Sequence, residues 1–196
     1  MMDNKPVLYR KRIIAAYLLG MVGIAASICT IYASPLPHGV TLGCGVKALS
    51  CGAALKSSFS HVFGVPLGVL GAGYFLFWLL NLHAYQRTRE DTYQAALTWC
   101  TATGAIVSCS LAFIMFVVLR SPCLYCLASH VSNLSCCVLL WPLRRWRFPE
   151  VSREEFWHFA SISAVALLAS TTIFFANENR IAHSETERWK RMVLEP

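Results

Sequence analysis

The residues with the clearest chemical potential are Cys123 and Cys126, which stand where a polar turn runs into a long apolar segment. Ser121 is a favourable N-cap and Pro122 suits the first helical position, so the sequence predicts that a helix begins here. Cys123 would then lie in the first turn, where backbone N–H groups and the helix dipole stabilise a thiolate. Cys126 follows one turn later on the same face. This spacing indicates a redox-active dithiol, with half of a zinc site or two packing cysteines as the alternatives.

Two further cysteines, Cys44 and Cys51, lie in a long polar interval, residues 34–61. Its first half is rich in proline and glycine, which favours an irregular loop. From Cys51 to His61 apolar residues recur at helical spacing, which predicts a short amphipathic helix at the membrane surface. Disulfides exchange by attack of a thiolate on a sulfur, so two dithiol pairs on one membrane face suggest an electron relay that needs no metal.

The composition is that of a membrane protein. Of the 196 residues, 56% are hydrophobic and 14% are charged, and the mean hydropathy is +0.51, whereas soluble domains carry roughly 25% charged residues. The net charge of +7 would suit nucleic acid, but the basic residues flank apolar runs, as topology determinants do. We therefore predict an all-α integral membrane protein that binds no nucleic acid and forms a single membrane domain over residues 1–196.

Five long apolar segments predict five membrane spans, since a helix needs about 20 residues to cross the hydrocarbon core. A signal peptide is the alternative for the first, but that run exceeds the roughly 7–15 residues of such a peptide's apolar region. The predicted spans are residues 13–33, 62–84, 95–119, 122–143 and 156–176. The glycines of the second span suit close helix packing or a ligand pocket equally well.

The distribution of Lys and Arg predicts the orientation of these spans. Residues 1–12, 85–94 and 144–155 fall on one side and hold ten basic residues, whereas residues 34–61 and Arg120 contribute three on the other, leaving out the C-terminal tail. The positive-inside rule then puts the N-terminus in the cytoplasm. All four cysteines named above would face outward, on the oxidising side of the membrane.

Polar residues continue along the helix predicted at the dithiol. Spacings of four, three and four residues give one stripe, formed by Cys126, His130, Asn133 and Cys137. Polar groups within a span are costly and normally face the bundle interior or a ligand. His130 and Asn133 would either hydrogen-bond neighbouring helices or border a quinone pocket beside Cys126. Ser57, on the predicted surface helix, could reach the same ligand or be an ordinary exposed serine.

In their order along the chain these features resemble the vitamin K epoxide reductase family, in particular its bacterial branch. The matching residues are Cys44, Cys51, Ser57, Phe63-Gly64-Val65-Pro66-Leu67 and Cys123-Leu124-Tyr125-Cys126. The resemblance covers roughly residues 10–143. The DsbB family performs similar chemistry but carries its C-x-x-C in the first outward loop, so the order in this chain favours the reductase family.

The resemblance implies a four-helix transmembrane bundle around a quinone, with a short half-helix over its mouth, to which this chain adds a fifth transmembrane helix. It also implies roles for the cysteines. Cys44 and Cys51 would form a shuttle disulfide that accepts electrons from a thioredoxin-like partner. Cys51 would exchange with Cys123, and Cys126 would face the quinone.

The resemblance extends to the quinone side of the site, with two departures. Ser57 matches the family's quinone-side serine, and Asn133 stands where a polar helix residue of the family is expected. His130 takes a place where some members carry a tyrosine. Many bacterial members also have a thioredoxin domain after the fifth helix, whereas this sequence stops about 20 residues past it. The implied partner is then a separate periplasmic thioredoxin-like (DsbA-like) thiol oxidase, which can be as oxidising as about −120 mV.

The sequence thus predicts a multi-pass enzyme of the bacterial inner membrane that reoxidises this partner and reduces ubiquinone or menaquinone without a metal. Three alternatives remain. One is a quinone or vitamin K epoxide reductase that uses external thiols. Another is a membrane metal carrier that uses the soft thiolates and His130. The last is a structural membrane protein with one stabilising disulfide.

Overall fold

The structure, a computed structural model, describes residues 5–33, 54–55, 57–62, 64–144, 146 and 152–194. Within these residues the chain is built from long helices joined by short connections. They are α1 (Lys5–Ala33), α3 (Leu67–Thr88), α4 (Asp91–Phe113), α5 (Leu124–Leu140) and α6 (Arg153–Leu194). Cys44 and Cys51 lie outside the described residues.

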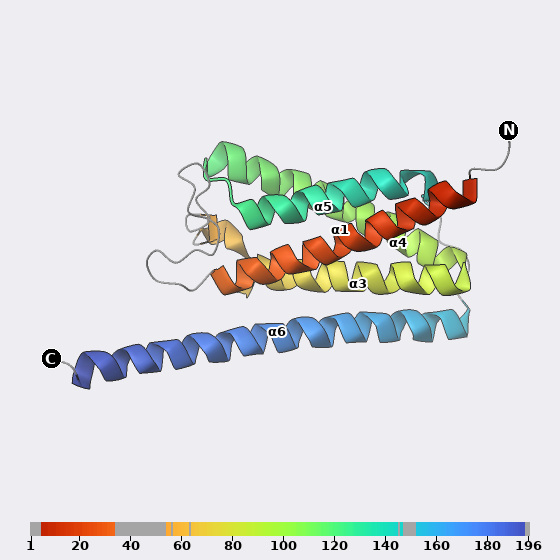
Figure 1. The fold of residues 1–196 in the computed structure, drawn as a ribbon. Helices are drawn as coiled ribbons and strands as arrows, with labels where there is room; N and C mark the ends of the chain where they lie inside the picture. Colours follow the sequence, from red (N-terminus) through yellow and green to blue (C-terminus); the bar gives the residue numbers. More distant parts are fainter. Residues whose placement is uncertain are drawn as a thin grey trace.

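Four of the helices form a bundle and the fifth lies outside it (Figure 1). In the bundle, α1 packs on α3 and α5, and α4 packs on the same two helices, while α6 runs along α3. Four described segments are long and apolar enough to cross a membrane: residues 9–33, 67–88, 91–118 and 153–176. This confirms the predicted all-α multi-pass membrane fold.

The core of the bundle is tightly packed at the end where α1 begins. Eight buried residues form one apolar cluster there: Ile13, Ala16, Trp78, Leu79, Leu82, Leu97, Cys136 and Leu140. The indole N–H of Trp78 donates to Thr101 Oγ1 at 2.8 Å, so the largest buried side chain also has its polar atom satisfied. The opposite half of the bundle holds the cavity described below.

Helix α3 lies close to two neighbours because small residues line its contacts. A Cβ at Gly68 would overlap the Thr30 hydroxyl and lie 2.9 Å from the backbone oxygen of Ser27, both on α1. A Cβ at Gly73 would overlap the Ser170 hydroxyl on α6. Small residues therefore set the approach of α3 to both helices, as is common between membrane helices.

The segment before α3 is not the continuous helix that the sequence predicts. Residues 54 and 55 are helical and Ser58–Ser60 form a 3-10 turn, but β1 (His61–Val62) then pairs antiparallel with β2 (Val65–Pro66). Gly64, with φ of +81°, makes the tight turn between the strands. The hydroxyls of Ser57 and Ser60 each donate to the carbonyl three residues earlier, an arrangement that competes with an α-helix. As a result α3 begins at Leu67, whereas the second span was predicted from residue 62.

The other helices also differ from the predicted spans at their ends. Helix α1 extends back to Lys5, and α4 begins at Asp91 and continues through a π-helical turn at Ile114–Val118. Helix α5 has 17 residues, so it is shorter than the predicted fourth span. These boundaries leave the order of the elements unchanged.

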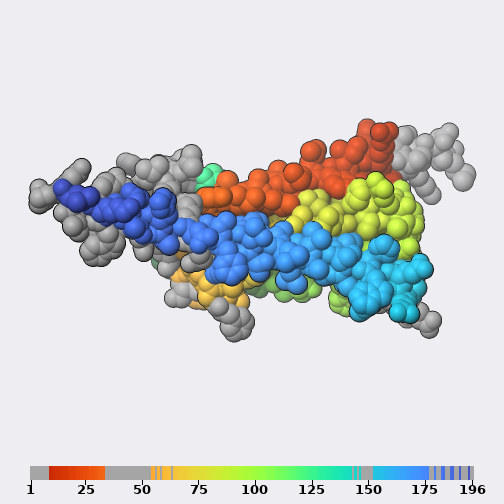
Figure 2. Space-filling model, turned by 90° about the horizontal axis from the view of Figure 1, so that it is seen from below, coloured from red at the N-terminus to blue at the C-terminus, as the bar shows by residue number. Residues whose placement is uncertain are grey.

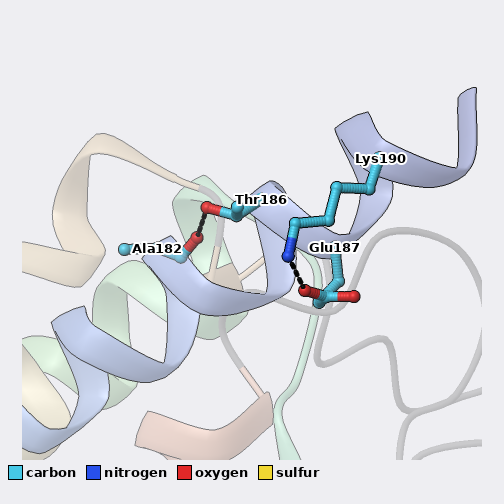
Figure 3. Close-up of polar contacts among 4 residues, drawn as sticks. All are labelled: Ala182, Thr186, Glu187 and Lys190. Atoms are coloured by element: carbon cyan, nitrogen blue, oxygen red, sulfur yellow. Dashed lines mark hydrogen bonds and ion pairs between the residues drawn. The ribbon is translucent and has the colours of Figure 1, made fainter. Parts of the chain in front are cut away.

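Helix α6 is twice as long as the fifth predicted span, because the mixed-charge tail continues it to Leu194. Figure 3 shows two contacts in this extension, an ion pair of 2.8 Å between Lys190 and Glu187 and a bond from the Thr186 hydroxyl to the Ala182 carbonyl. The extension projects past the bundle at the end where α1 stops and α5 starts (Figures 1 and 2). With a rise of about 1.5 Å per residue, it reaches roughly 27 Å beyond Ala176.

The close approach of α1 and α3 can be tested with Gly68→Ala. The added methyl group meets backbone as well as side-chain atoms of α1, so we expect a loss of about 1–3 kcal/mol in the free energy of unfolding. Gly71→Ala is the matched control, because its Cβ would meet only the Ser27 side chain. Denaturant unfolding in detergent measures both variants. Equal losses in the two would contradict the role given to Gly68.

Candidate redox site beside an apolar cavity

Helix α5 begins at Leu124, two residues later than predicted, and its N-cap is Cys123 instead of Ser121. Cys123 has extended backbone angles, with φ of −102° and ψ of 123°, and its sulfur accepts the N–H of Cys126 at 3.5 Å. The sulfur thus takes the position that a serine oxygen holds in an ordinary cap. A hydrogen bond from a helix N–H favours the thiolate form of such a sulfur, although the helix starts later than predicted.

The Cys123 side chain is fully enclosed, with 0% of it exposed. It packs in a small apolar cluster with Ala54, Leu55 and Met115. Its own N–H donates to the Met115 sulfur at 3.2 Å. Met115 lies in the π-helical turn at the end of α4, and its carbonyl accepts the N–H of Ser121 at 3.2 Å. Met115 therefore holds the connection between α4 and α5 through two hydrogen bonds, one to its sulfur and one to its carbonyl.

A cavity of about 700 Å³ lies within this half of the bundle, and Cys126 lines it. Its volume is in the range of small-molecule sites, roughly 300–1,000 Å³. All four bundle helices contribute to its wall, as do residues 54–66 and Phe159 of α6. Most of the apolar wall comes from α3 and α4: Leu67, Leu70, Phe75, Phe77, Trp99, Val107, Leu111, Ile114 and Met115. Cys123 is not part of the wall, so the two cysteines of the motif face different surroundings.

Three predicted ligand-side residues line the same cavity: Ser57, His130 and Asn133. The His130 ring is half-buried and has no hydrogen-bond partner among the described residues, which leaves its nitrogens available to a ligand. The Ser57 hydroxyl donates to the Ala54 carbonyl at 2.7 Å, so it offers the cavity an acceptor. Cys137, the last residue of the predicted stripe, instead lines a separate cavity of about 40 Å³ with Leu140 and Trp141.

Asn133 is held in a single orientation by neighbours on α3 and α4. Its Oδ1 accepts the Tyr74 hydroxyl at 2.6 Å, and its Nδ2 donates to the Ser108 hydroxyl at 3.0 Å. A Cβ at Gly104 would overlap the Tyr74 hydroxyl and lie 2.9 Å from Nδ2, so only glycine leaves room for this arrangement. The amide has a second N–H on Nδ2, which remains free to donate to a ligand carbonyl.

The sequence interpretation missed three polar side chains of the cavity wall that contact other helices: Tyr74, Ser27 and Ser129. Tyr74 stands 59 positions before Asn133, and no local spacing connects the two. The hydroxyls of Ser27 and Ser129 lie 3.2 Å apart, joining α1 to α5 across the cavity wall. Polar residues inside apolar helices were the available signal, but which of them pair depends on how the helices are rotated in the bundle.

The remaining described cysteines have separate surroundings. Cys100 lines the cavity, Cys136 is buried in the core cluster, and Cys29 and Cys109 are exposed. Among the described residues, no group of three or more His, Cys, Asp and Glu side chains is arranged to hold a metal ion.

Comparison with known proteins agrees with this geometry. The model of the vitamin K epoxide reductase family matches residues 14–141, a stretch that contains the four bundle helices from the first third of α1 to the end of α5. No curated protein matches the chain at a significant level.

The hydrogen bond from the Tyr74 hydroxyl to Asn133 Oδ1 predicts that Tyr74→Phe lowers the stability of the protein. This change removes only the hydroxyl and leaves the buried Asn133 Oδ1 without its donor, so the free energy of unfolding should fall by about 1–3 kcal/mol. Tyr17→Phe is the control, because no described residue hydrogen-bonds the Tyr17 hydroxyl. Denaturant titration of both variants measures the difference. A Tyr74→Phe protein as stable as the control would contradict the network.

Proposed function

The chain belongs to the vitamin K epoxide reductase family of quinone-linked membrane oxidoreductases, and on that basis we propose that it reoxidises a thioredoxin-like thiol oxidase and passes the electrons to quinone. The observation that carries the proposal is that the two cysteines at the start of α5 have different surroundings. Cys126 lines an apolar cavity, whereas Cys123 packs against Ala54 and Leu55. These two residues follow shortly after Cys44 and Cys51 in the sequence, in the predicted loop of residues 34–61. This difference supports a role of Cys126 toward a membrane ligand and of Cys123 toward the loop.

In the proposed relay, electrons pass from the partner dithiol to the Cys44–Cys51 disulfide and then to the Cys123–Cys126 disulfide. Each transfer is an attack of a thiolate on a disulfide sulfur. Cys51 stands three residues before Ala54 in the sequence, so its Cα can be at most about 11 Å from that of Ala54. Because Ala54 packs in the same cluster as Cys123, this reach supports an exchange between Cys51 and Cys123.

The cavity suits a quinone because it combines a largely apolar wall with a few polar groups. The second N–H of Asn133 can donate to a carbonyl oxygen. The His130 ring, which has no hydrogen-bond partner among the described residues, can donate to or accept from the same ligand. Ser57 offers an acceptor, which suits the hydroxyl of the reduced form. When bound, ubiquinone or menaquinone supplies an acceptor for two electrons and two protons. Cys126 supplies the reacting sulfur on the cavity wall.

The proposed location is the bacterial inner membrane, with the N-terminus in the cytoplasm and the cysteines on the periplasmic side. The excess of basic residues in 1–12, 85–94 and 144–155 supports this orientation. A periplasmic site also agrees with the chemistry, because disulfides persist in that compartment. The partner is then a soluble periplasmic protein with a reactive dithiol of its own.

The central test is quinone reduction by purified protein supplied with a reduced thioredoxin-like dithiol protein. Cys126→Ala should abolish turnover with ubiquinone and menaquinone, because Cys123 would have no partner thiol on the cavity wall with which to complete the electron transfer. Cys109→Ala, at an exposed helix position away from the cavity wall, should retain wild-type turnover. A Cys126→Ala enzyme with normal turnover would remove Cys126 from the reaction.

The order of the relay can be tested by trapping its intermediate. Cys44→Ala should abolish turnover with the protein partner. The double variant Cys44→Ala/Cys126→Ala lacks both resolving thiols, so a disulfide between Cys51 and Cys123 should accumulate. Mass spectrometry of unreduced peptides detects this link. Its absence, with Cys51 and Cys123 both recovered as free thiols under oxidising conditions, would rule out direct exchange between them.

A further inference from the structure

A chain of hydrogen bonds joins the cavity wall to an exposed histidine before α3. Ser57 and Ser60 both line the cavity. The Ser60 hydroxyl lies 2.7 Å from the Ser57 carbonyl and 2.8 Å from Nδ1 of His61. The His61 side chain is exposed, and its Nε2 has no hydrogen-bond partner among the described residues. An exposed ring is thus hydrogen-bonded to the hydroxyl of a residue that lines the cavity.

The donors in this series of hydrogen bonds can be assigned by counting hydrogens. A serine hydroxyl has one hydrogen, and Ser60 donates it to the Ser57 carbonyl. The contact between Ser60 Oγ and His61 Nδ1 then requires Nδ1 to be the donor. His61 is therefore held with its proton on Nδ1 when neutral, and its Nε2 is free to take up a second proton.

The position of His61 is fixed by the hairpin between the 3-10 turn and α3. His61 is paired with Pro66 and Val62 with Val65, and Val62, Pro66 and Leu67 all line the cavity. The strand that carries the histidine is therefore part of the cavity wall. Its ring is exposed and hydrogen-bonded to Ser60, a residue that lines the cavity.

The proposed function creates a need for such a connection, and this inference rests on it. Reduction of a quinone to a quinol consumes two electrons and two protons. The N–H of Cys126 favours the thiolate of Cys123, so the reduced pair is a thiolate and a thiol. Its conversion to a disulfide releases two electrons but only one proton, and the second proton must reach the cavity from elsewhere.

We propose that His61 and Ser60 carry this second proton from the surface into the cavity. His61 Nε2 takes a proton from water, the Nδ1 proton moves to Ser60 Oγ, and the original Ser60 hydroxyl proton is delivered to a ligand oxygen in the cavity. Thiolate, thiol, quinone and this proton together give the Cys123–Cys126 disulfide and the quinol, with charge and atoms balanced. The step leaves His61 as the neutral Nε2–H tautomer, and proton exchange with water restores the Nδ1–H form before the next cycle.

The kinetic test uses protein reduced beforehand, mixed with ubiquinone or menaquinone in a single turnover and then quenched with an alkylating agent. His61→Ala and Ser60→Ala should slow oxidation of the Cys123–Cys126 pair by about 10-fold or more, a modest share of what proton transfer by a side chain contributes. Ser60→Thr keeps the hydroxyl and should retain most of the rate. His83→Ala, at an exposed position of α3 outside the cavity wall, is the matched control.

Two further measurements separate a proton route from a structural role. Added imidazole should restore part of the rate of His61→Ala, because it can occupy the vacated space and carry the proton. Nitrogen NMR of histidine-labelled protein without quinone should show the His61 signal as the Nδ1–H form, and Ser60→Ala should abolish that preference. Reduction of the loop disulfide by the partner should be unchanged in every variant.

The outcomes distinguish this inference from the proposed function. If wild-type protein oxidises its dithiol with quinone and both His61→Ala and Ser60→Ala match it, the proton route is wrong and the relay stands. An Nε2–H form of His61 in the wild type would also overturn the route. If wild-type protein fails to reduce either quinone, the proposed function itself fails, whatever the histidine variants do.

Discussion

The start of α5 and the proposed thiol chemistry both depend on the hydrogen bond from the Cys126 N–H to the Cys123 sulfur. Because Cys123 acts as the cap of α5, its sulfur lies at the point where the helix has unpaired N–H groups to offer. The helix then carries Cys126 almost one turn further, onto the cavity wall. A dithiol built in this way has one sulfur at the helix end and one inside the bundle, with no further element needed to separate them.

The bundle can be hollow at one end because it is closely packed at the other. Trp78, Leu79 and Leu82 of α3 meet α1, α4 and α5 in the core cluster, and the hydrophobic free energy of holding the helices together is concentrated there. In the other half, polar wall groups such as Asn133 and Ser129 bond to residues of other helices. Satisfied polar groups of this kind cost little in an apolar wall, whereas unsatisfied ones would oppose folding.

The sequence was sufficient for the fold class and for the cysteine pair because both depend on local patterns. Apolar runs of span length predict helices, and a C-x-x-C ahead of such a run predicts a helix-end dithiol. Helical spacing also brought His130 and Asn133 to the wall that Cys126 lines. The same spacing failed for Cys137 because 11 residues correspond to about 16 Å along the helix axis. At that distance α5 has passed the cavity and entered the packed core.

Other features depended on contacts that a sequence does not display. Helix α5 begins at Leu124, later than predicted, because the Cys123 sulfur can itself cap the helix. The hairpin at residues 61–66 replaced a helical pattern because the serine hydroxyls and Gly64 favour turns. The bond between Tyr74 and Asn133 requires α3 and α5 to face one cavity. The mixed-charge tail also misled through its local pattern, since Glu, Arg and Lys are good helix formers as well as markers of exposed segments.

The short segment at residues 54–66 joins the two halves of the proposed chemistry. Ala54 and Leu55 cover Cys123, whose sulfur has no exposed surface, and Ser57 and Ser60 form part of the cavity wall a few residues later. A thiolate must approach a disulfide sulfur directly to exchange with it, so the cover at residues 54 and 55 has to shift whenever Cys123 reacts with the loop. Because the same backbone continues into the cavity wall, that shift also changes the surroundings of the ligand. In the proposed relay, thiol exchange at Cys123 and chemistry in the cavity would therefore be linked through this one segment of the chain.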